Sequence, residues 1–225
     1  MSANPQVGSF TVRNASFAYA QICYVLHWCA FIYAMGFLID FVAPTGVDSG
    51  LPASLGYSIT IDVSLALLFV VVHWIMAQQR FKDAWFRLIP AALERSTYVL
   101  VSSVLLISIF LMWAPIPMVV WDVQQQGARV LIFSIYWLGW LLAIGATFPI
   151  NHWDLFGVRQ AYLLLENLPQ TEAETADSLL YRYIPHPIFV GYVVVFWSTP
   201  HMSVGHALLS AIMTALVIVV VWGGH

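Results

Sequence analysis

Long apolar runs separated by short polar stretches recur along the whole chain. A helix that crosses a bilayer needs about 20 mostly apolar residues, because each residue advances about 1.5 Å across a hydrocarbon core about 30 Å thick. Backbone N–H and C=O groups cannot stay unpaired in lipid, so we expect these runs to be helical. Six stretches reach or approach that length: residues 17–42, 59–77, 97–113, 130–148, 188–197 and 206–222.

The last two runs lie closest together, and the first of them is short. Only a few residues separate them, among them Pro200 and Gly205, so we predict a tight helical hairpin. The pattern as a whole predicts an all-α, polytopic membrane protein with about six transmembrane helices and this C-terminal hairpin. The runs follow each other so closely that we expect residues 1–225 to form a single membrane domain.

Composition points to the same class of protein. Of the 225 residues, 61% are hydrophobic and only 8% are charged, whereas soluble domains carry roughly 25% charged residues. A soluble fold could not cover its surface with so few charges, so the lipid bilayer is the expected partner. The formal net charge of −3 is small and argues against nucleic acid as a partner.

The cations predict an orientation. Arg13 precedes the first run, no Lys or Arg lies between the first and second runs, and Arg129 lies between the third and fourth. With a cytoplasmic N-terminus, seven of the eight cations would face the cytoplasm, as the positive-inside rule favours. Six spans then also place the C-terminus in the cytoplasm. Residues 78–96 mix aromatic side chains with four of these cations, which predicts a segment lying on the cytoplasmic leaflet.

Two histidines fall well inside apolar runs, where polar groups are costly and therefore often functional. His27 lies in the middle of the first run and His73 late in the second. They could ligate a haem, a chlorophyll-type ring or a metal, or each could simply be hydrogen-bonded to a neighbouring helix. Neither a CxxCH nor an HExxH motif is present, so we expect no metal site from motifs.

Polar clusters flank three of the runs. His152 and Asp154, preceded by Asn151, place an imidazole and a carboxylate after the fourth run and are candidate catalytic residues; a polar helix end is the alternative. Glu94 and Arg95 precede the third run, where an acid suits a helix N-terminus. Before the fifth run, Pro185 and Pro187 bracket His186 and hold it on a stiff, extended segment.

These segments, in this order, resemble the bacterial methanethiol S-methyltransferases and the NnrU-like proteins, within the isoprenylcysteine carboxyl methyltransferase superfamily. The resemblance implies a helical domain of the bacterial inner membrane that binds S-adenosylmethionine on its cytoplasmic side and methylates a small thiol. It also implies cofactor binding by His186, Pro187 and Phe189. The resemblance rests on residues 31–50, 73–82, 90–100, 113–122, 151–160 and 186–206.

The chain departs from the family pattern in two places. Pro185 stands where the family has an arginine, and proline offers neither the charge nor the donors that anchor a carboxylate. The family's motif after the last span, a Glu-Glu pair followed by a glycine and paired tyrosines, has no counterpart before His225, which implies a short form. We therefore expect a non-catalytic accessory subunit of a larger membrane complex, with no cofactor. The alternative is an S-adenosylmethionine-dependent methanethiol S-methyltransferase.

Overall fold

The fold is described by a computed structural model of the chain over residues 9–41, 43–51, 53–85, 89–174 and 176–223. Within these residues, five helices are long and apolar enough to cross a membrane, and a sixth apolar helix is shorter. The predicted all-α membrane fold is therefore confirmed. The six helices are α1 (Phe10–Phe37), α2 (Leu55–Ala77), α4 (Glu94–Met112), α5 (Gln126–Gly145), α9 (Pro187–Trp197) and α10 (Val204–Gly223).

Most of these helices begin before the expected apolar runs, because polar first turns precede them. α1 starts seven residues before residue 17, and the Ser9 hydroxyl accepts a hydrogen bond from the amide of Val12. Ser54 caps α2 in the same way, through the amide of Tyr57. Capping hydroxyls satisfy amides that have no partner within the helix, so the polar residues extend each helix beyond its apolar run.

Short elements connect the long helices. The connection between α2 and α4 contains α3 (Gln79–Trp85) and the 3₁₀ turn η1 (Ala91–Leu93). The connection from α5 to α9 contains α6 (His152–Leu155), α7 (Val158–Leu165) and α8 (Leu179–Tyr183). The predicted interfacial segment 78–96 thus begins as a short helix, while its residues 86–88 lie outside the described part. Its position on a leaflet stays a prediction.

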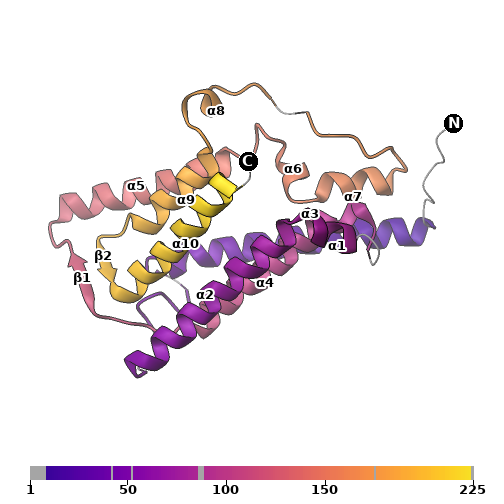
Figure 1. The fold of residues 1–225 in the computed structure, drawn as a ribbon. Helices are drawn as coiled ribbons and strands as arrows, with labels where there is room; N and C mark the ends of the chain where they lie inside the picture. Colours follow the sequence, from indigo (N-terminus) through magenta and orange to yellow (C-terminus); the bar gives the residue numbers. More distant parts are fainter. Residues whose placement is uncertain (1–8, 42, 52, 86–88, 175, 224–225) are drawn as a thin grey trace.

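The helices form two groups, which Figure 1 shows next to each other. In one group α4 packs against both α1 and α2; in the other α9 packs against α5 and α10, so the predicted hairpin forms. α5 and α9 approach closely because Gly139 and Gly191 face each other: a Cβ on Gly191 would lie 2.7 Å from the Gly139 oxygen. α10 also contacts α2 and closes the bundle.

One feature of the fold, a small antiparallel sheet, was absent from the sequence expectations. β1 (Val119–Asp122) pairs with β2 (His201–Ser203), and Asp122 lies opposite His201. β2 occupies the connection between α9 and α10, so the hairpin is tied to the segment after α4 (Figure 1). Pro115 and Pro117 end the preceding helical run, since neither can donate the amide hydrogen bond that a helix needs.

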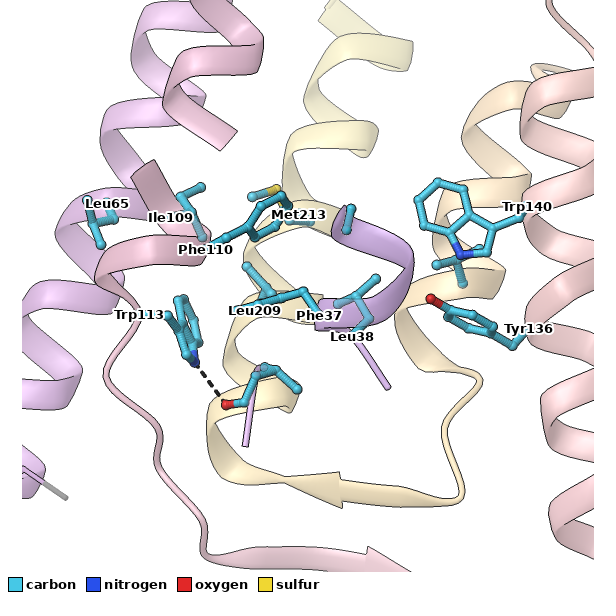
Figure 2. Packing of buried hydrophobic residues seen from close by; sticks show 13 residues of the cluster. Phe37, Leu38, Leu65, Ile109, Phe110, Trp113, Tyr136, Trp140, Leu209 and Met213 are labelled. Carbon is cyan, nitrogen blue, oxygen red and sulfur yellow. Dashed lines mark hydrogen bonds between the residues drawn. The ribbon is translucent and has the colours of Figure 1, made fainter. Parts of the chain in front are cut away.

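The buried core lies where α1, α4, α5 and α10 converge. Figure 2 shows Phe37 and Phe110 among Leu209 and Met213, and the Phe37 and Phe110 rings are 4.8 Å apart. The Trp113 indole N–H donates to the Val47 carbonyl oxygen at 3.1 Å, which fixes the loop after α1 against the end of α4. Phe110, Leu209 and Met213 of this core also line a cavity between the helices.

Candidate functional site

A partly open cavity of about 350 Å³ lies between the helices, and all six apolar helices contribute to its wall. The wall is mainly aliphatic and aromatic, and none of the described residues that line it is a lysine or an arginine. Its size falls in the range of about 300–1,000 Å³ that is typical of small-molecule sites. The side chains in the wall that carry polar atoms are those of His27, His73, Tyr98, Ser102, Ser103, Trp140 and Tyr192.

His27 and His73 both line this cavity, and neighbouring serines of α4 hold them. The Nδ1 atom of His27 is 3.3 Å from the Ser103 hydroxyl, and that of His73 is 3.1 Å from the Ser102 hydroxyl. Sequence reasoning placed the histidines in spans but missed the two serines. A pair of adjacent hydroxyls within an apolar run was the signal that could have found them.

Aromatic rings form a continuous layer along one side of the cavity. The Phe31 ring lies 5.3 Å from Trp140 and 5.9 Å from Tyr192. On its other side it lies 4.7 Å from His27, whose ring is 4.8 Å from Phe156. Aromatic faces attract cations and also stack on planar groups, so this wall suits a positively charged sulfur or a heteroaromatic ring.

His152 lies at the end of that layer, with both ring nitrogens engaged. Nε2 is 2.8 Å from the Tyr24 hydroxyl, and Nδ1 is 2.6 Å from the Thr147 hydroxyl. Thr147 donates its own proton to the Ile144 carbonyl, so its oxygen accepts the Nδ1 proton and the Tyr24 hydroxyl donates to Nε2. Burial lowers the pKa of His152 below its ordinary value, which favours the neutral ring that this arrangement requires.

Asp154 joins two arginines next to His152. Its carboxylate accepts from Arg95 at 2.7 Å and from Arg159 at 3.2 Å, so α6 and α7 are tied to the start of α4. Asn151, with φ of 66°, caps α6 through the amide of Asp154. Gly157, with φ of 82°, lies so close to Ser96 that an added Cβ would sit 2.5 Å from its amide nitrogen. Sequence reasoning did not anticipate that Asp154 is shared between two cations.

The Pro-His-Pro segment forms the start of α9. His186 is the exposed N-cap, with φ of 51°, and Pro187 is the buried first residue of the helix. The Phe189 side chain lines the cavity and lies 6.2 Å from the His186 ring. Of the predicted cofactor residues, Phe189 therefore lines the cavity directly, while His186 and Pro187 lie at the start of its helix.

The predicted site residues form two groups. His27, His73 and Phe189 line the cavity, whereas His152 and Asp154 lie at one end of the bundle and connect to it through Phe156, 4.8 Å from His152. Glu94 belongs to neither group, because it forms an ion pair with Lys82 at 3.3 Å. Among the described residues, no three His, Cys, Asp or Glu side chains are grouped to hold a metal ion.

Comparison with known proteins identifies the family. The chain is 42% identical over 207 residues to the methanethiol S-methyltransferase of Mycobacterium tuberculosis. The matched residues make up 92% of this chain and 85% of that protein. The chain belongs to the methanethiol S-methyltransferase family. Methanethiol S-methyltransferase 2 of Bradyrhizobium diazoefficiens is 39% identical over 92% of this chain and 80% of its own length. The methanethiol S-methyltransferase of Crocosphaera subtropica is 38% identical over 95% of this chain and 84% of its own length. No family model and no solved structure matches the chain.

Membership of the methanethiol S-methyltransferase family corrects one expectation. Several relatives that match most of the chain carry the name of an enzyme, which overturns the expected non-catalytic accessory subunit in favour of the methyltransferase alternative. That expectation had rested in part on Pro185, which stands where the family has an arginine.

Proposed function

We propose that this protein is an S-adenosylmethionine-dependent methyltransferase that methylates methanethiol or a similarly small thiol inside the intramembrane cavity. The family of the chain supports the reaction class. The observation that carries the proposal is the cavity itself, an apolar space with an aromatic wall and two histidines held by serines. Such a space excludes water, which strengthens the attraction between a thiolate and a cationic methyl donor.

The residues of the cavity fit the reactive end of the cofactor. S-adenosylmethionine supplies an electrophilic methyl group on a positively charged sulfur. Phe31, Trp140 and Tyr192 offer aromatic faces to such a cation, and no lining residue is a lysine or arginine that would repel it. Phe189 is the predicted cofactor residue that lines the same space.

The start of α9 is the proposed position of the polar end of the cofactor. His186 is exposed there and contributes an imidazole where Pro185 contributes no charge. Pro187 is buried as the first residue of α9, where its fixed φ suits a helix start and orients the turn that bears Phe189. We therefore retain His186, Pro187 and Phe189 as cofactor-binding residues.

We assign His152 and Asp154 to the positioning of this site. Their hydrogen bonds and ion pairs fix Phe156 and the α6–α7 segment against α1 and α4. Neither ring nitrogen of His152 is free to take a proton from a substrate. The alternative, a direct catalytic role for either residue, stays a prediction, which Asp154→Asn and His152→Gln test in the assay below.

The protein's own residues orient the thiol in the cavity and keep water away from it. The six helices enclose the thiol and confine it against the aromatic wall, which converts an encounter in water into a reaction between neighbours. Both termini are proposed to face the cytoplasm, the compartment in which S-adenosylmethionine is made. The expected partner subunits stay a prediction.

Purified protein in lipid nanodiscs tests the proposed function. With S-adenosylmethionine and methanethiol, we expect dimethyl sulfide, detected by gas chromatography, and saturable cofactor binding by calorimetry. Phe189→Ala should weaken cofactor binding about tenfold or more, because it removes a large aromatic contact from the cavity wall. Val190→Ala is the matched control on the same helix, since Val190 is more exposed and does not line the cavity. Wild-type protein that neither binds the cofactor nor forms dimethyl sulfide would refute the proposal.

A further inference from the structure

The hydroxyl of Ser103 determines which nitrogen of His27 carries a proton. Ser103 has one hydroxyl proton and donates it to the Val99 carbonyl oxygen at 2.7 Å. Towards His27 the same oxygen can only accept, so the Nδ1 atom at 3.3 Å must be the donor. A neutral imidazole has one N–H, and Nε2 is therefore left with its lone pair.

The ring of His27 is also held in place. Phe31 lies 4.7 Å from it on one side and Phe156 lies 4.8 Å from it on another, and both rings are tilted against the imidazole. Among the described residues no side chain or backbone group forms a hydrogen bond with Nε2. His27 lines the cavity, and Nε2 is its ring nitrogen that carries a lone pair and no hydrogen bond within the described residues.

His73 does not share this arrangement. Its Nδ1 atom faces the Ser102 hydroxyl at 3.1 Å, but either atom can be the donor, because no backbone carbonyl among the described residues accepts the Ser102 proton. Its ring stacks on Phe69 at 5.2 Å and lies 4.8 Å from Tyr98. The two histidines thus have similar surroundings, while Ser103 fixes the tautomer of His27 alone.

We infer that His27 is the general base of the reaction, a step that rests on the proposed function. Nε2 takes the proton from the thiol as the S–H bond breaks. The electron pair left on that sulfur forms the new bond to the methyl carbon of the sulfonium donor, while the old methyl–sulfur bond breaks and its pair neutralises the sulfonium. The proton leaves His27 for solvent after each turnover, and Ser103 returns the ring to the same tautomer.

Two thiols of nearly equal size but different acidity separate this role from a structural one. Trifluoroethanethiol loses its proton far more readily than ethanethiol, so it needs a base less. His27→Gln should lower kcat/KM about 100-fold or more with ethanethiol, the usual contribution of a general base. With trifluoroethanethiol we expect His27→Gln to lower kcat/KM less than about tenfold, because this more acidic thiol loses its proton without help from a base. An equal loss with both thiols would overturn the inference.

His73→Gln is the matched control, because it changes the other cavity histidine in the same way. It should reduce activity with both thiols by the same factor. Cofactor binding measured by calorimetry should survive in His27→Gln. If the wild type binds no cofactor and methylates no thiol, the proposed function fails. If the wild type is active and the His27→Gln variant is equally active, only the role of His27 as general base fails.

A measurement that needs no activity tests the same assignment. Nitrogen-15 spectra of histidine-labelled protein in nanodiscs should show His27 with the proton on Nδ1, and Ser103→Ala should populate the other tautomer. A wild-type ring that carries its proton on Nε2 would overturn the inference whether or not the protein is active. An unchanged tautomer in Ser103→Ala would remove the role assigned to Ser103.

Discussion

His152 illustrates how a single residue depends on its surroundings. Its ring accepts from Tyr24 and donates to Thr147, and it stacks on Phe148 at 4.7 Å. A protonated ring could not accept the Tyr24 proton. Burial, which lowers the pKa of this histidine, and the hydrogen bonds therefore favour the same neutral state.

The stability of the protein should depend on the protonation of His152. An unfolded histidine titrates near pH 6.5, while the folded pKa lies lower, so below about pH 6.5 the unfolded chain takes up a proton that the folded chain resists. Stability is thus present above that pH and lost as the pH falls. We expect the thermal midpoint to drop between about pH 7.5 and about pH 5.5, and to drop less in His152→Gln.

Tyr24→Phe provides the control for this measurement. It removes a hydrogen bond that only the neutral ring can accept but keeps the buried imidazole, so it should lower the midpoint most at neutral pH and weaken its pH dependence without abolishing it. A His152→Gln variant with the same pH dependence as the wild type would show that this imidazole does not contribute.

At the scale of elements, the contact between α5 and α9 positions the wall of the cavity. Gly139 and Gly191 let the two helices approach, and this contact places Trp140 and Tyr192 beside the same space. Their rings lie 6.3 Å apart. The glycines therefore serve close packing, and the aromatic side chains next to them line the site.

Gly191→Ala should disturb this contact. The new methyl group would meet the Ala143 nitrogen and the Gly139 oxygen at 2.7 Å, both backbone atoms that cannot move aside easily. We expect a loss of about 1–3 kcal/mol in unfolding free energy, the usual cost of overpacking, measured by denaturation in mixed micelles. Gly145→Ala, on α5 with no atom within 4 Å of the new methyl group, should be neutral or slightly stabilising. Equal effects of both substitutions would contradict this account.

At the scale of the molecule, cations gather at one end of the bundle. The N-terminal end of α1, together with α3, α6 and α7, lies at that end, while Arg129 follows β1 near the other (Figure 1). Arg95 and Arg159 there form the ion pairs with Asp154. The end that carries the charge is therefore also the end that holds the α6–α7 segment against the helices.

Cysteine labelling should establish the orientation. In a Cys29→Ala background, Glu172→Cys should react with an impermeant reagent only after the cells are opened, and Gln124→Cys should react in intact spheroplasts. The positive-inside rule is the physical reason, because the cation-rich end resists translocation. Both positions are exposed, so access is decided by the membrane alone. The reverse labelling pattern would refute the predicted orientation.

The sequence by itself determined the membrane class, the approximate spans and the family of this protein. These depend on local sums of hydropathy and on ordered motifs, which need no knowledge of which helices touch. The positions of His27 and His73 inside spans, and of His186 before a short helix, could also be predicted for this reason.

Only the tertiary structure decided which helix faces meet. It brings Ser103 to His27, shares Asp154 between Arg95 and Arg159, and pairs β1 with β2 across about eighty residues of chain. In an apolar span every face looks alike to a hydropathy pattern, since lipid and helix interior are equally apolar. Close packing and the pairing of the few polar groups distinguish those faces, and both are properties of the assembled bundle.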